Sequence, residues 1–217
     1  AMAICQASSE QVEVAVFARA PAPGRAKTRL LPVLGSVGAG RLQRRLTLRA
    51  LSLAHAAAIG PVTLWAAYYR HRFFRALQAR SGVDLRAQID GDLGARMAAV
   101  FAAHGGPLLL IGSDCPALSV ADLTAAAKAL RETGKDAVEA VFIPAEDGGY
   151  VLVGLRRPQP LLFSGIDWGS QQVMAQTRER LGDLGLRWQE LPALWDVDRP
   201  EDLARLAVFE EFAEWLR

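Results

Sequence analysis

Residues 12–35 read VEVAVFARAPAPGRAKTRLLPVLG, and this stretch decides the fold. Its first part, Val12–Ala18, is a short apolar run whose β-branched content suits a buried strand better than a helix. Pro21, Pro23 and Gly24 then disfavour any regular element. The sequence therefore predicts a strand that runs directly into an irregular loop.

The predicted loop is strongly basic. It contains Arg19, Arg25, Lys27 and Arg29 and no acidic residue. In open α/β sheets ligands bind beyond the carboxyl ends of the strands, where backbone N–H groups and basic side chains meet phosphate oxygens. A lone cluster of charges is more often a solvated surface turn. The position after a strand favours a phosphate-binding loop here.

The basic character extends well beyond this loop. Residues 14–83 contain twelve Lys or Arg and no Asp or Glu, whereas residues 84–217 contain 13 basic and 21 acidic residues. One third of the chain is therefore positively charged. An RNA-binding face would explain this charge too, but no nucleic-acid motif and few aromatic residues accompany the arginines. We expect no nucleic-acid partner.

Two common phosphate-binding motifs are absent from this region. A Walker loop that used Lys27 would need glycines where Pro21 and Ala26 stand. A Rossmann fingerprint would need G-x-G-x-x-G, but Gly35, Gly38 and Gly40 have the wrong spacing and lie well beyond the strand.

Strands and helices are expected to alternate along the rest of the chain. Helices are predicted over residues 39–59, 70–80, 93–104, 119–132, 171–184 and 200–216, and strands over 61–66, 83–88, 108–111, 138–143, 150–155 and 186–191. This order predicts a three-layer α/β/α architecture around a mainly parallel mixed sheet. No linker or change in composition divides the chain, so we expect a single domain over residues 1–217.

The composition excludes several classes of protein. The chain is 51% hydrophobic and 22% charged, which is ordinary for a globular protein and unlike disordered or collagen-like chains. No apolar run has the length of a membrane span, and the start lacks the pattern of a signal peptide, so the cytoplasm is the expected location. Ala1, ahead of Met2, resembles a residue left after removal of a tag. Cys5 and Cys115 are too far apart in sequence to indicate a metal motif or a disulfide framework, and both are expected to be reduced.

A carboxylate follows the predicted strand over residues 108–111, in the segment Gly112-Ser113-Asp114-Cys115-Pro116. Asp114 would repel a phosphate bound by the basic loop unless a cation lay between them. Mg²⁺ binds one or two carboxylates together with substrate phosphates, so it would satisfy both groups. The alternative is that Asp114 only closes a turn or caps the next helix.

A second group of carboxylates precedes the last predicted helix, in Trp195-Asp196-Val197-Asp198-Arg199-Pro200-Glu201-Asp202. Asp198 and Glu201 have the spacing of an N-cap and its capping partner, which is a sufficient explanation for both. Asp196 and Asp198 are two positions apart, so only one of them need face a site.

A third acidic segment is Glu146-Asp147-Gly148-Gly149-Tyr150, between two predicted strands. Asp-Gly between strands is a strong hairpin signal, so a plain turn is the simpler interpretation. Glycine also permits close approach of a ligand to the backbone. Asp147 is therefore a candidate to hold or deprotonate an acceptor hydroxyl.

Several of these motifs, in this order, resemble a bacterial GT-A-like glycosyltransferase family whose members are largely uncharacterised. The resemblance covers nearly the whole chain. It rests on residues 17–21 and 23–30, Gly91-Asp92-Leu93-Gly94-Ala95-Arg96-Met97, residues 112–116 and 146–150, Trp168-Gly169-Ser170 and Asp196-Val197-Asp198. That family belongs to the nucleotide-diphospho-sugar transferase superfamily. It is also similar to the guanylyltransferases of molybdenum cofactor and of 2-phospholactate.

The resemblance implies a GT-A fold and a set of functional residues. The nucleotide-binding residues would be Arg19, Pro21, Gly24, Lys27, Thr28, Arg29, Gln88 and Asp92, with Gln88 and Asp92 near the base. Lys27, Asp114 and Asp147 would act in catalysis. Asp114 and Asp198 would hold Mg²⁺ or Mn²⁺.

The implied function is a Mg²⁺-dependent transferase that uses a nucleotide-activated sugar and a small-molecule acceptor. Many GT-A glycosyltransferases have Asp-x-Asp at the metal, whereas this chain has Asp114-Cys115-Pro116, which is closer to the Asp-x-Pro of nucleotidyltransferases. A guanylyltransferase-like enzyme acting on a nucleoside triphosphate and a small phosphorylated acceptor is the alternative. A non-catalytic nucleotide- or RNA-binding protein is a third.

Overall fold

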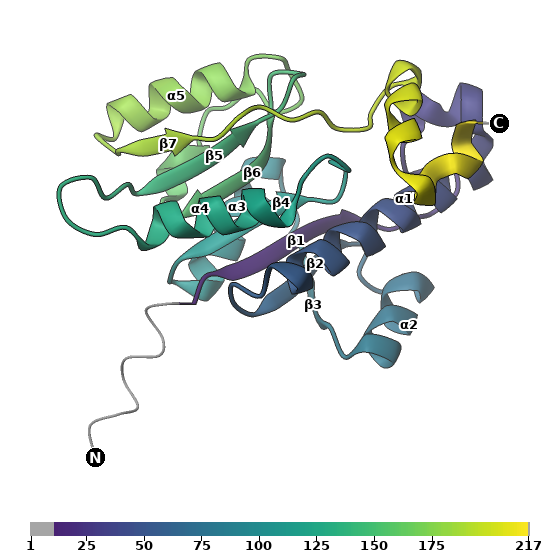
Figure 1. Ribbon diagram of the computed structural model, residues 1–217, viewed down its shortest axis with the longest axis horizontal. Coiled ribbons are helices and arrows are strands. Elements are labelled where there is room, and N and C mark those ends of the chain that lie inside the picture. Colours follow the sequence, from purple (N-terminus) through teal and green to yellow (C-terminus); the bar gives the residue numbers. More distant parts are fainter. Residues whose placement is uncertain (1–10, 217) are drawn as a thin grey trace.

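The computed structural model describes residues 11–216, and its strands form one sheet in the order β3-β2-β1-β4-β6-β5-β7 (Figure 1). The strands are β1 (Glu13–Arg19), β2 (Val62–Ala67), β3 (Asp84–Ala87), β4 (Leu108–Gly112), β5 (Ala140–Pro144), β6 (Tyr150–Leu155) and β7 (Trp188–Glu190). β6 pairs antiparallel with both β4 and β5, and every other pair in this sheet is parallel. The predicted mainly parallel mixed sheet is confirmed.

Helices cover both faces of the sheet, which gives three layers (Figure 1). The α-helices are α1 (Leu31–Ala57), α2 (Arg72–Ser81), α3 (Leu93–His104), α4 (Val120–Arg131) and α5 (Val173–Asp183), and the 3₁₀ helices are η1 (Thr28–Leu30), η2 (Pro160–Phe163), η3 (Pro200–Val208) and η4 (Glu210–Leu216). Side chains of α1, α2 and α4 pack on one face, and those of α3, α5 and η2 pack on the other. No helix within residues 11–216 is long and apolar enough to cross a membrane.

Strand β1 lies inside the sheet, between β2 and β4, and is buried on both sides. Val14 and Val16 belong to the core beneath α1, α2 and α4, whereas Ala15 and Phe17 belong to the core beneath α3 and α5. A strand buried on both faces needs a continuous apolar run instead of strict alternation. This explains why the sequence from Val12 to Ala18 is almost entirely apolar.

The sheet brings one end of every strand to a common edge. Six strands contribute their carboxyl ends, and β6, which runs the other way, contributes its start. Arg19, Gln88, Ser113 and Tyr150 therefore lie at this edge although they are far apart in sequence. This is where an open α/β sheet binds ligands.

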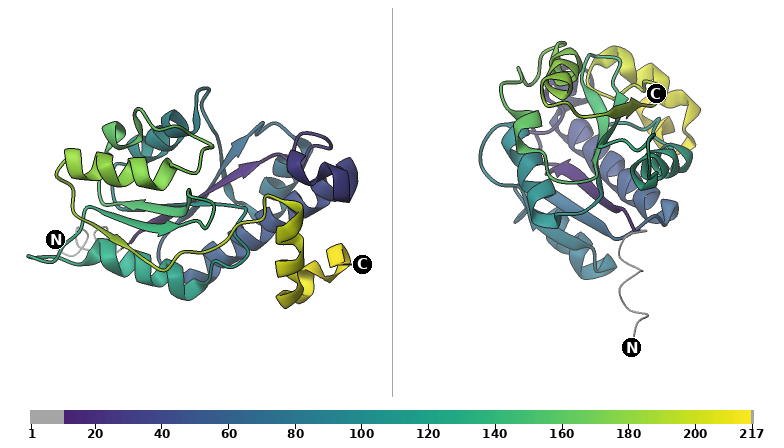
Figure 2. Two further views of the ribbon diagram at one scale, coloured as in Figure 1. Left: turned by 90° about the horizontal axis from the view of Figure 1, so that it is seen from above. Right: turned by 90° about the vertical axis from the view of Figure 1, so that its left-hand side faces the viewer.

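The last part of the chain packs against the start of α1, as two views show (Figures 1 and 2). A third apolar cluster joins the two segments. It contains Leu30, Leu42 and Leu46 from the first segment and Val197, Leu203, Leu206 and Phe212 from the last. This contact holds residues 196–202 beside the basic loop.

The single helix predicted over residues 200–216 is wrong. The segment forms two 3₁₀ helices, because Phe209 between them is extended, with φ −110° and ψ 110°. The extended residue turns the chain so that the Phe209 ring meets both Trp195, at 6.5 Å between ring centroids, and Phe212, at 6.2 Å. Packing of these rings offsets the loss of a continuous helix.

The helix predicted over residues 39–59 begins earlier, at Leu31. Pro32 is tolerated in its first turn, and the helix kinks at Gly35, where φ is 64° and ψ is 174°. The other predicted elements agree within a few residues, and the helix over 93–104 and the strand over 150–155 agree at both ends.

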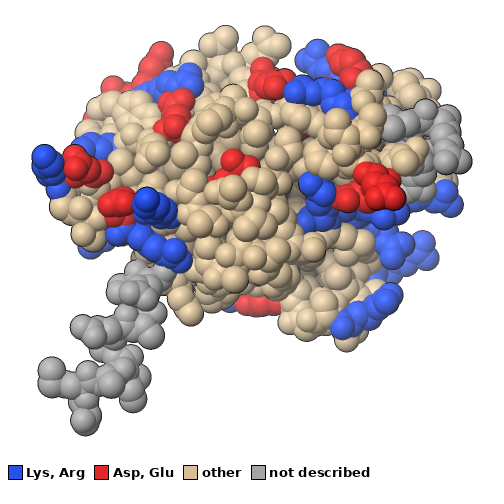
Figure 3. Space-filling model, viewed as in Figure 1, with Lys and Arg blue, Asp and Glu red and all other residues tan. Residues whose placement is uncertain are grey.

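The positive region predicted over residues 14–83 forms a visible patch. In Figure 3, Lys and Arg side chains gather towards the lower right, over α1 and α2, whereas both signs of charge alternate elsewhere on this face. Most of that charge therefore lies on helix surfaces, whereas the loop between β1 and α1 brings basic residues to the ligand edge of the sheet.

Candidate active site

Two adjoining cavities open at the ligand edge of the sheet. We call the first, of about 360 Å³, the inner cavity, and the second, of about 760 Å³, the outer cavity. The polar residues of the inner cavity include Arg19, Lys27, Thr28, Gln43, Gln88, Arg96, Ser113, Asp114 and Asp198. The outer cavity is lined by residues 146–150, 168–171 and 195–205 in part, and it shares Arg19, Asp114 and Asp198 with the inner one.

Lys27 connects three distant segments at the inner cavity. Its Nζ lies 3.0 Å from Asp114 Oδ1 and also donates to the carbonyl of Val197. Only 4% of the Lys27 side chain is exposed, compared with 45% of the Asp114 side chain. Lys27 itself adopts a left-handed conformation, with φ 51°, which turns the loop into η1. The basic loop, the end of β4 and the late acidic segment therefore meet at one buried ammonium group.

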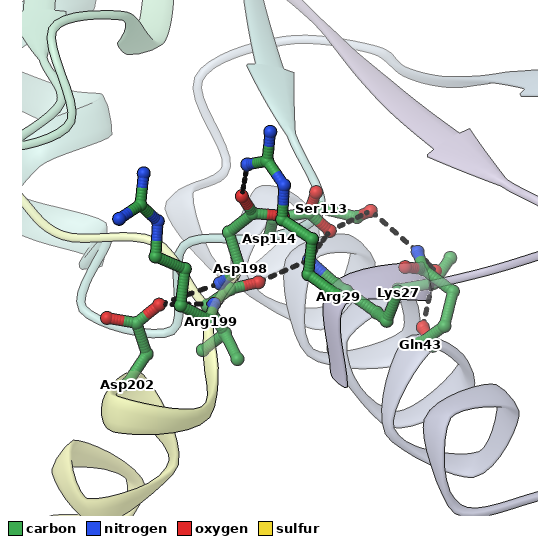
Figure 4. A network of polar contacts seen from close by, with 10 residues as sticks. Lys27, Arg29, Gln43, Ser113, Asp114, Asp198, Arg199 and Asp202 are labelled. Atoms are coloured by element: carbon green, nitrogen blue, oxygen red, sulfur yellow. Dashed lines mark hydrogen bonds and ion pairs between the residues drawn. The ribbon is translucent and has the colours of Figure 1, made fainter. Parts of the chain in front are cut away.

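A buried hydrogen-bond network holds Asp114 in place (Figure 4). Gln43 Nε2 donates to Ser113 Oγ at 3.1 Å, and Ser113 Oγ donates to Asp114 Oδ1 at 3.3 Å. Gln43 and Ser113 are almost fully buried. This network is absent from the sequence-based predictions. The sequence signal that could have indicated it is Gln43. A polar amide beside the apolar face of a helix needs a hydrogen-bond partner if it is buried.

Asp198 pairs with the basic loop and not with the helix that follows it. Its carboxylate contacts the Arg29 guanidinium. The helix is instead capped by Asp202, whose Oδ2 accepts from the N–H groups of Asp198 at 2.9 Å and Arg199 at 2.7 Å (Figure 4). The predicted capping by Asp198 and Glu201 is therefore wrong, and the Asp198 side chain is left to line both cavities.

Asp196 is half-buried and has a perturbed carboxyl group. Burial raises its pKa to about 6, and the nearby charges of Asp147 and Asp114 act in the same direction. Asp196 lines the outer cavity. Both Asp196 and Asp198 therefore face the site, because Val197 between them points the other way and is fully buried in the third apolar cluster.

The other predicted nucleotide-binding residues fall into two groups. Arg19, Thr28 and Gln88 line the inner cavity, and Gln88 is oriented by its donation to the Trp65 carbonyl at 2.9 Å. Pro21 and Gly24 shape the loop: the Pro21 carbonyl packs close to Gly40 of α1, and Gly24 has a positive φ of 74°.

Asp92 has a local structural role in this structure. Its Oδ1 accepts from the Ala95 N–H at 2.8 Å and caps α3. Among residues 11–216, neither cavity has Asp92, Pro21 or Gly24 in its wall.

Asp147 lies in the turn between β5 and β6, at the outer cavity. Its Oδ1 accepts from the Gly149 N–H at 3.0 Å, as expected of an Asp-Gly hairpin turn. Gly148 has a φ of 95°, and a Cβ there would come within 2.1 Å of the Gln171 carbonyl. The turn is thus pressed against the segment before α5, which fixes Asp147 while its second oxygen remains available.

Two carboxylates at the inner cavity could hold a divalent cation. Asp114 and Asp198 provide carboxylate oxygens on one cavity, and each is paired with a cationic side chain. Within the described residues no group of three or more potential ligands stands together. Mg²⁺ is held in proteins by one or two carboxylates plus substrate phosphates and keeps its waters, so Asp114 and Asp198 could hold such an ion.

Cys115 is not a candidate nucleophile, although it follows Asp114 directly. Burial raises the pKa of its thiol to about 12, so the reactive thiolate is not formed at neutral pH. The thiol is free. Cys5 lies outside the described residues.

Comparisons with known proteins identify the family and the fold. The family described as "Uncharacterized protein conserved in bacteria (DUF2064)" matches residues 49–170. A putative nucleotide-diphospho-sugar transferase from Desulfovibrio desulfuricans G20 is similar in structure, with a TM-score of 0.80 and 28% identity over 93% of this chain and 89% of that chain. A search of curated proteins found no match.

More distant solved structures share the fold. CMP:2-keto-3-deoxy-manno-octonic acid synthetase complexed with CTP is 17% identical, with a TM-score of 0.60 over 93% of this chain and 98% of that chain. Rv0371c from Mycobacterium tuberculosis H37Rv in complex with manganese is also 17% identical, with a TM-score of 0.57 over 92% of this chain and 100% of that chain.

Proposed function

The chain belongs to the DUF2064 family and has a nucleotide-diphospho-sugar transferase-like fold, and on this premise we propose that it is a Mg²⁺-dependent transferase that takes a sugar from a nucleoside diphosphate and delivers it to a small-molecule acceptor. The observation that supports this most is the contact of Lys27 with Asp114 at the ligand edge of the sheet. The buried Lys27 ammonium is suited to a negatively charged diphosphate, and the Asp114 carboxylate on the same cavity is suited to its metal ion.

In this proposal the inner cavity binds the donor. The Lys27 ammonium and the Arg19 guanidinium would face the diphosphate oxygens, where negative charge grows as the sugar leaves. Gln88 and Thr28 line the same cavity and would contact the nucleoside. Lys27 is buried and held by the Val197 carbonyl, which keeps its ammonium group at the wall of this cavity.

Asp114 and Asp198 would hold the Mg²⁺ or Mn²⁺, which supplies positive charge to the leaving diphosphate. The buried Gln43 and Ser113 orient Asp114 as a positioning pair. Because Lys27 and Arg29 neutralise the two carboxylates in this structure, ligand binding would exchange these ion pairs for contacts with the ion and the phosphates.

In the transfer step, Asp147 would accept the proton of the acceptor hydroxyl group. The bond between the anomeric carbon and the diphosphate oxygen breaks, and the acceptor hydroxyl oxygen forms the new bond to that carbon. The hydroxyl proton passes to the Asp147 carboxylate, and the nucleoside diphosphate leaves. We infer that residues 1–217 act as one domain, since both cavities share walls from the first and last thirds of the chain.

A second candidate is nucleotidyl transfer. It is favoured by Asp114-Cys115-Pro116, in which Pro116 stands where many glycosyltransferases have a second metal-binding Asp. In that reaction an acceptor oxygen attacks the α-phosphorus of a nucleoside triphosphate and pyrophosphate leaves. The same cavity and cations would serve.

Product analysis separates these candidates. The purified protein with Mg²⁺ is incubated with panels of nucleoside diphosphate sugars and nucleoside triphosphates and small-molecule acceptors. Release of nucleoside diphosphate supports sugar transfer, and release of pyrophosphate supports the second candidate. Lys27→Met should abolish either product, whereas Lys128→Met, on the exposed face of α4, should not. Absence of both products together with absence of nucleotide binding would contradict the proposed function.

A further inference from the structure

The outer cavity is the place where an acceptor would meet the donor, and this inference rests on the proposed function. The inner and outer cavities share a wall that contains Arg19, Asp114 and Asp198. A group that leaves the inner cavity therefore enters the outer one directly. The chemistry of the outer wall should then indicate what kind of acceptor it takes.

The two cavities have opposite charge. The inner one has three basic side chains, Arg19, Lys27 and Arg96, against two carboxylates. The outer one has four arginines against six carboxylates, so its formal charge is negative. Complementarity of charge selects between binding partners because like charges repel. The outer cavity disfavours an anionic molecule, whereas the inner cavity favours one.

Ion pairs within the outer wall occupy two of its four arginines. Arg205 forms a two-pronged contact with Glu146, at 2.6 and 3.0 Å, and Arg29 contacts Asp198. These two arginines are therefore not available to an incoming anion. Within residues 11–216, neither Asp147 nor Asp196 has an ion-pair partner. The carboxylates that remain are acceptors of hydrogen bonds and have no donor of their own when ionised.

An aromatic surface stands beside these carboxylates. The half-buried Trp168 lines the outer cavity and is fixed from behind: a Cβ at Gly94 would lie 2.7 Å from its Nε1 and 2.8 Å from its Cζ2. Tyr150 supports the indole edge to face, at 6.4 Å between ring centroids. On the other side, the Arg205 guanidinium already covers the Trp195 ring at 4.4 Å. Trp168, and not Trp195, is therefore the indole that we expect to contact a ligand.

We propose that the outer cavity binds an uncharged polyhydroxylated acceptor, such as a sugar or polyol, with Trp168 against its C–H face and Asp147 and Asp196 accepting hydrogen bonds from its hydroxyl groups. Carboxylates match hydroxyl donors, and an indole matches the apolar face of such a molecule. A phosphate ester of the same molecule would bring negative charge into a wall that is already negative.

Matched pairs of probes test this assignment. Glucose and glucose 6-phosphate, and glycerol and glycerol 3-phosphate, are titrated into the full-length protein saturated with a nucleoside diphosphate and Mg²⁺, and binding is followed by ligand-observed NMR. We expect at least one uncharged probe to bind about tenfold tighter than its phosphate ester. Tighter binding of both esters, or binding of neither uncharged probe, would overturn the assignment.

Substitutions of the wall sharpen the test. Asp147→Asn retains the oxygen that accepts from Gly149 but removes the charge, so the preference for the uncharged probe should fall towards onefold. Asp136→Asn is the matched control on the exposed loop before β5, in the wall of neither cavity, and should leave the ratio unchanged. A purely structural role of Asp147 would weaken both members of a pair equally and would overturn its assignment.

Trp168→Leu should weaken the uncharged probe about tenfold without changing nucleotide affinity, and Trp168→Phe should restore most of it. Unchanged probe affinity in both variants would remove Trp168 from the acceptor site. If the wild-type protein did not bind the nucleotide at all, the proposed function itself would be contradicted, and the acceptor assignment would be rejected with it.

Discussion

The basic wall and the acidic wall of the site are built in different ways. The basic wall is one loop, in which Arg19, Lys27 and Arg29 lie within eleven residues. The acidic wall is assembled from the end of β4, the β5–β6 turn and the segment after β7. The first depends on local sequence, whereas the second exists only when the sheet has formed. Damage to the basic wall should therefore affect binding, and damage to the acidic wall should affect folding as well.

The largest effect is expected at the basic wall. Lys27→Met removes the ammonium that faces the proposed diphosphate, and affinity for a nucleoside diphosphate should fall about 100-fold, as measured by calorimetry. The unphosphorylated nucleoside should bind nearly as before. Equal losses for both ligands would show that Lys27 does not act on phosphate.

The next effect concerns the turn that supports Asp147. Gly148→Ala places a Cβ against the Gln171 backbone and strains a φ of 95°, so the free energy of unfolding should fall by about 2–3 kcal/mol in denaturant titrations. Gly134→Ala has a similar φ of 87° but open space around the new Cβ, and it should cost only about 1 kcal/mol. Equal costs would mean that contact with Gln171 does not hold the acidic wall.

A smaller effect, of opposite sign, is expected at Asp196. Its folded-state pKa of about 6 lies above the ordinary 3.8, so the folded protein binds this proton more tightly than the unfolded chain does. The stabilisation from protonated Asp196 is complete below pH 3.8 and is lost as the pH rises through 6. Asp196→Asn should therefore stabilise the metal-free protein by about 1–2 kcal/mol at pH 7.5 and by almost nothing at pH 4. Thermal unfolding across this pH range checks it, and a pH-independent gain would contradict the assigned burial.

The smallest effect belongs to a helix end away from both walls. Ser119 and Asp122 form the predicted capping box of α4, and Ser119→Ala should cost about 1 kcal/mol of stability without changing nucleotide affinity. This variant calibrates the other three. If its nucleotide affinity fell as well, binding would respond to global stability and the two walls could not be distinguished.

The basic loop, the alternating elements and the segments around Asp114 and Asp147 could be predicted because each has a local signal, such as a breaker, a periodicity or a hairpin turn. The partners of these residues could not. The contact of Lys27 with the Val197 carbonyl and the exchange of the cap from Asp198 to Asp202 depend on how the last segment packs against α1. The break at Phe209 has the same origin, because its ring packs against Trp195, which is distant in sequence, and against Phe212.

The net charge of the outer cavity also could not be predicted from the sequence. Residues 84–217 are acidic overall, but their carboxylates are spread over many segments, and only the sheet edge selects which of them line the cavity. Asp196 illustrates this, since its neighbours Asp147 and Asp114 are 49 and 82 positions away in the chain.

The most direct test of the shared site is a crystal structure of the protein with a nucleoside diphosphate and Mn²⁺, in which anomalous scattering locates the metal. We predict Mn²⁺ bound directly to the Asp114 carboxylate and Lys27 Nζ moved from Asp114 onto a phosphate oxygen. A diphosphate bound elsewhere, or one bound while the Lys27–Asp114 ion pair remains intact without metal, would contradict it.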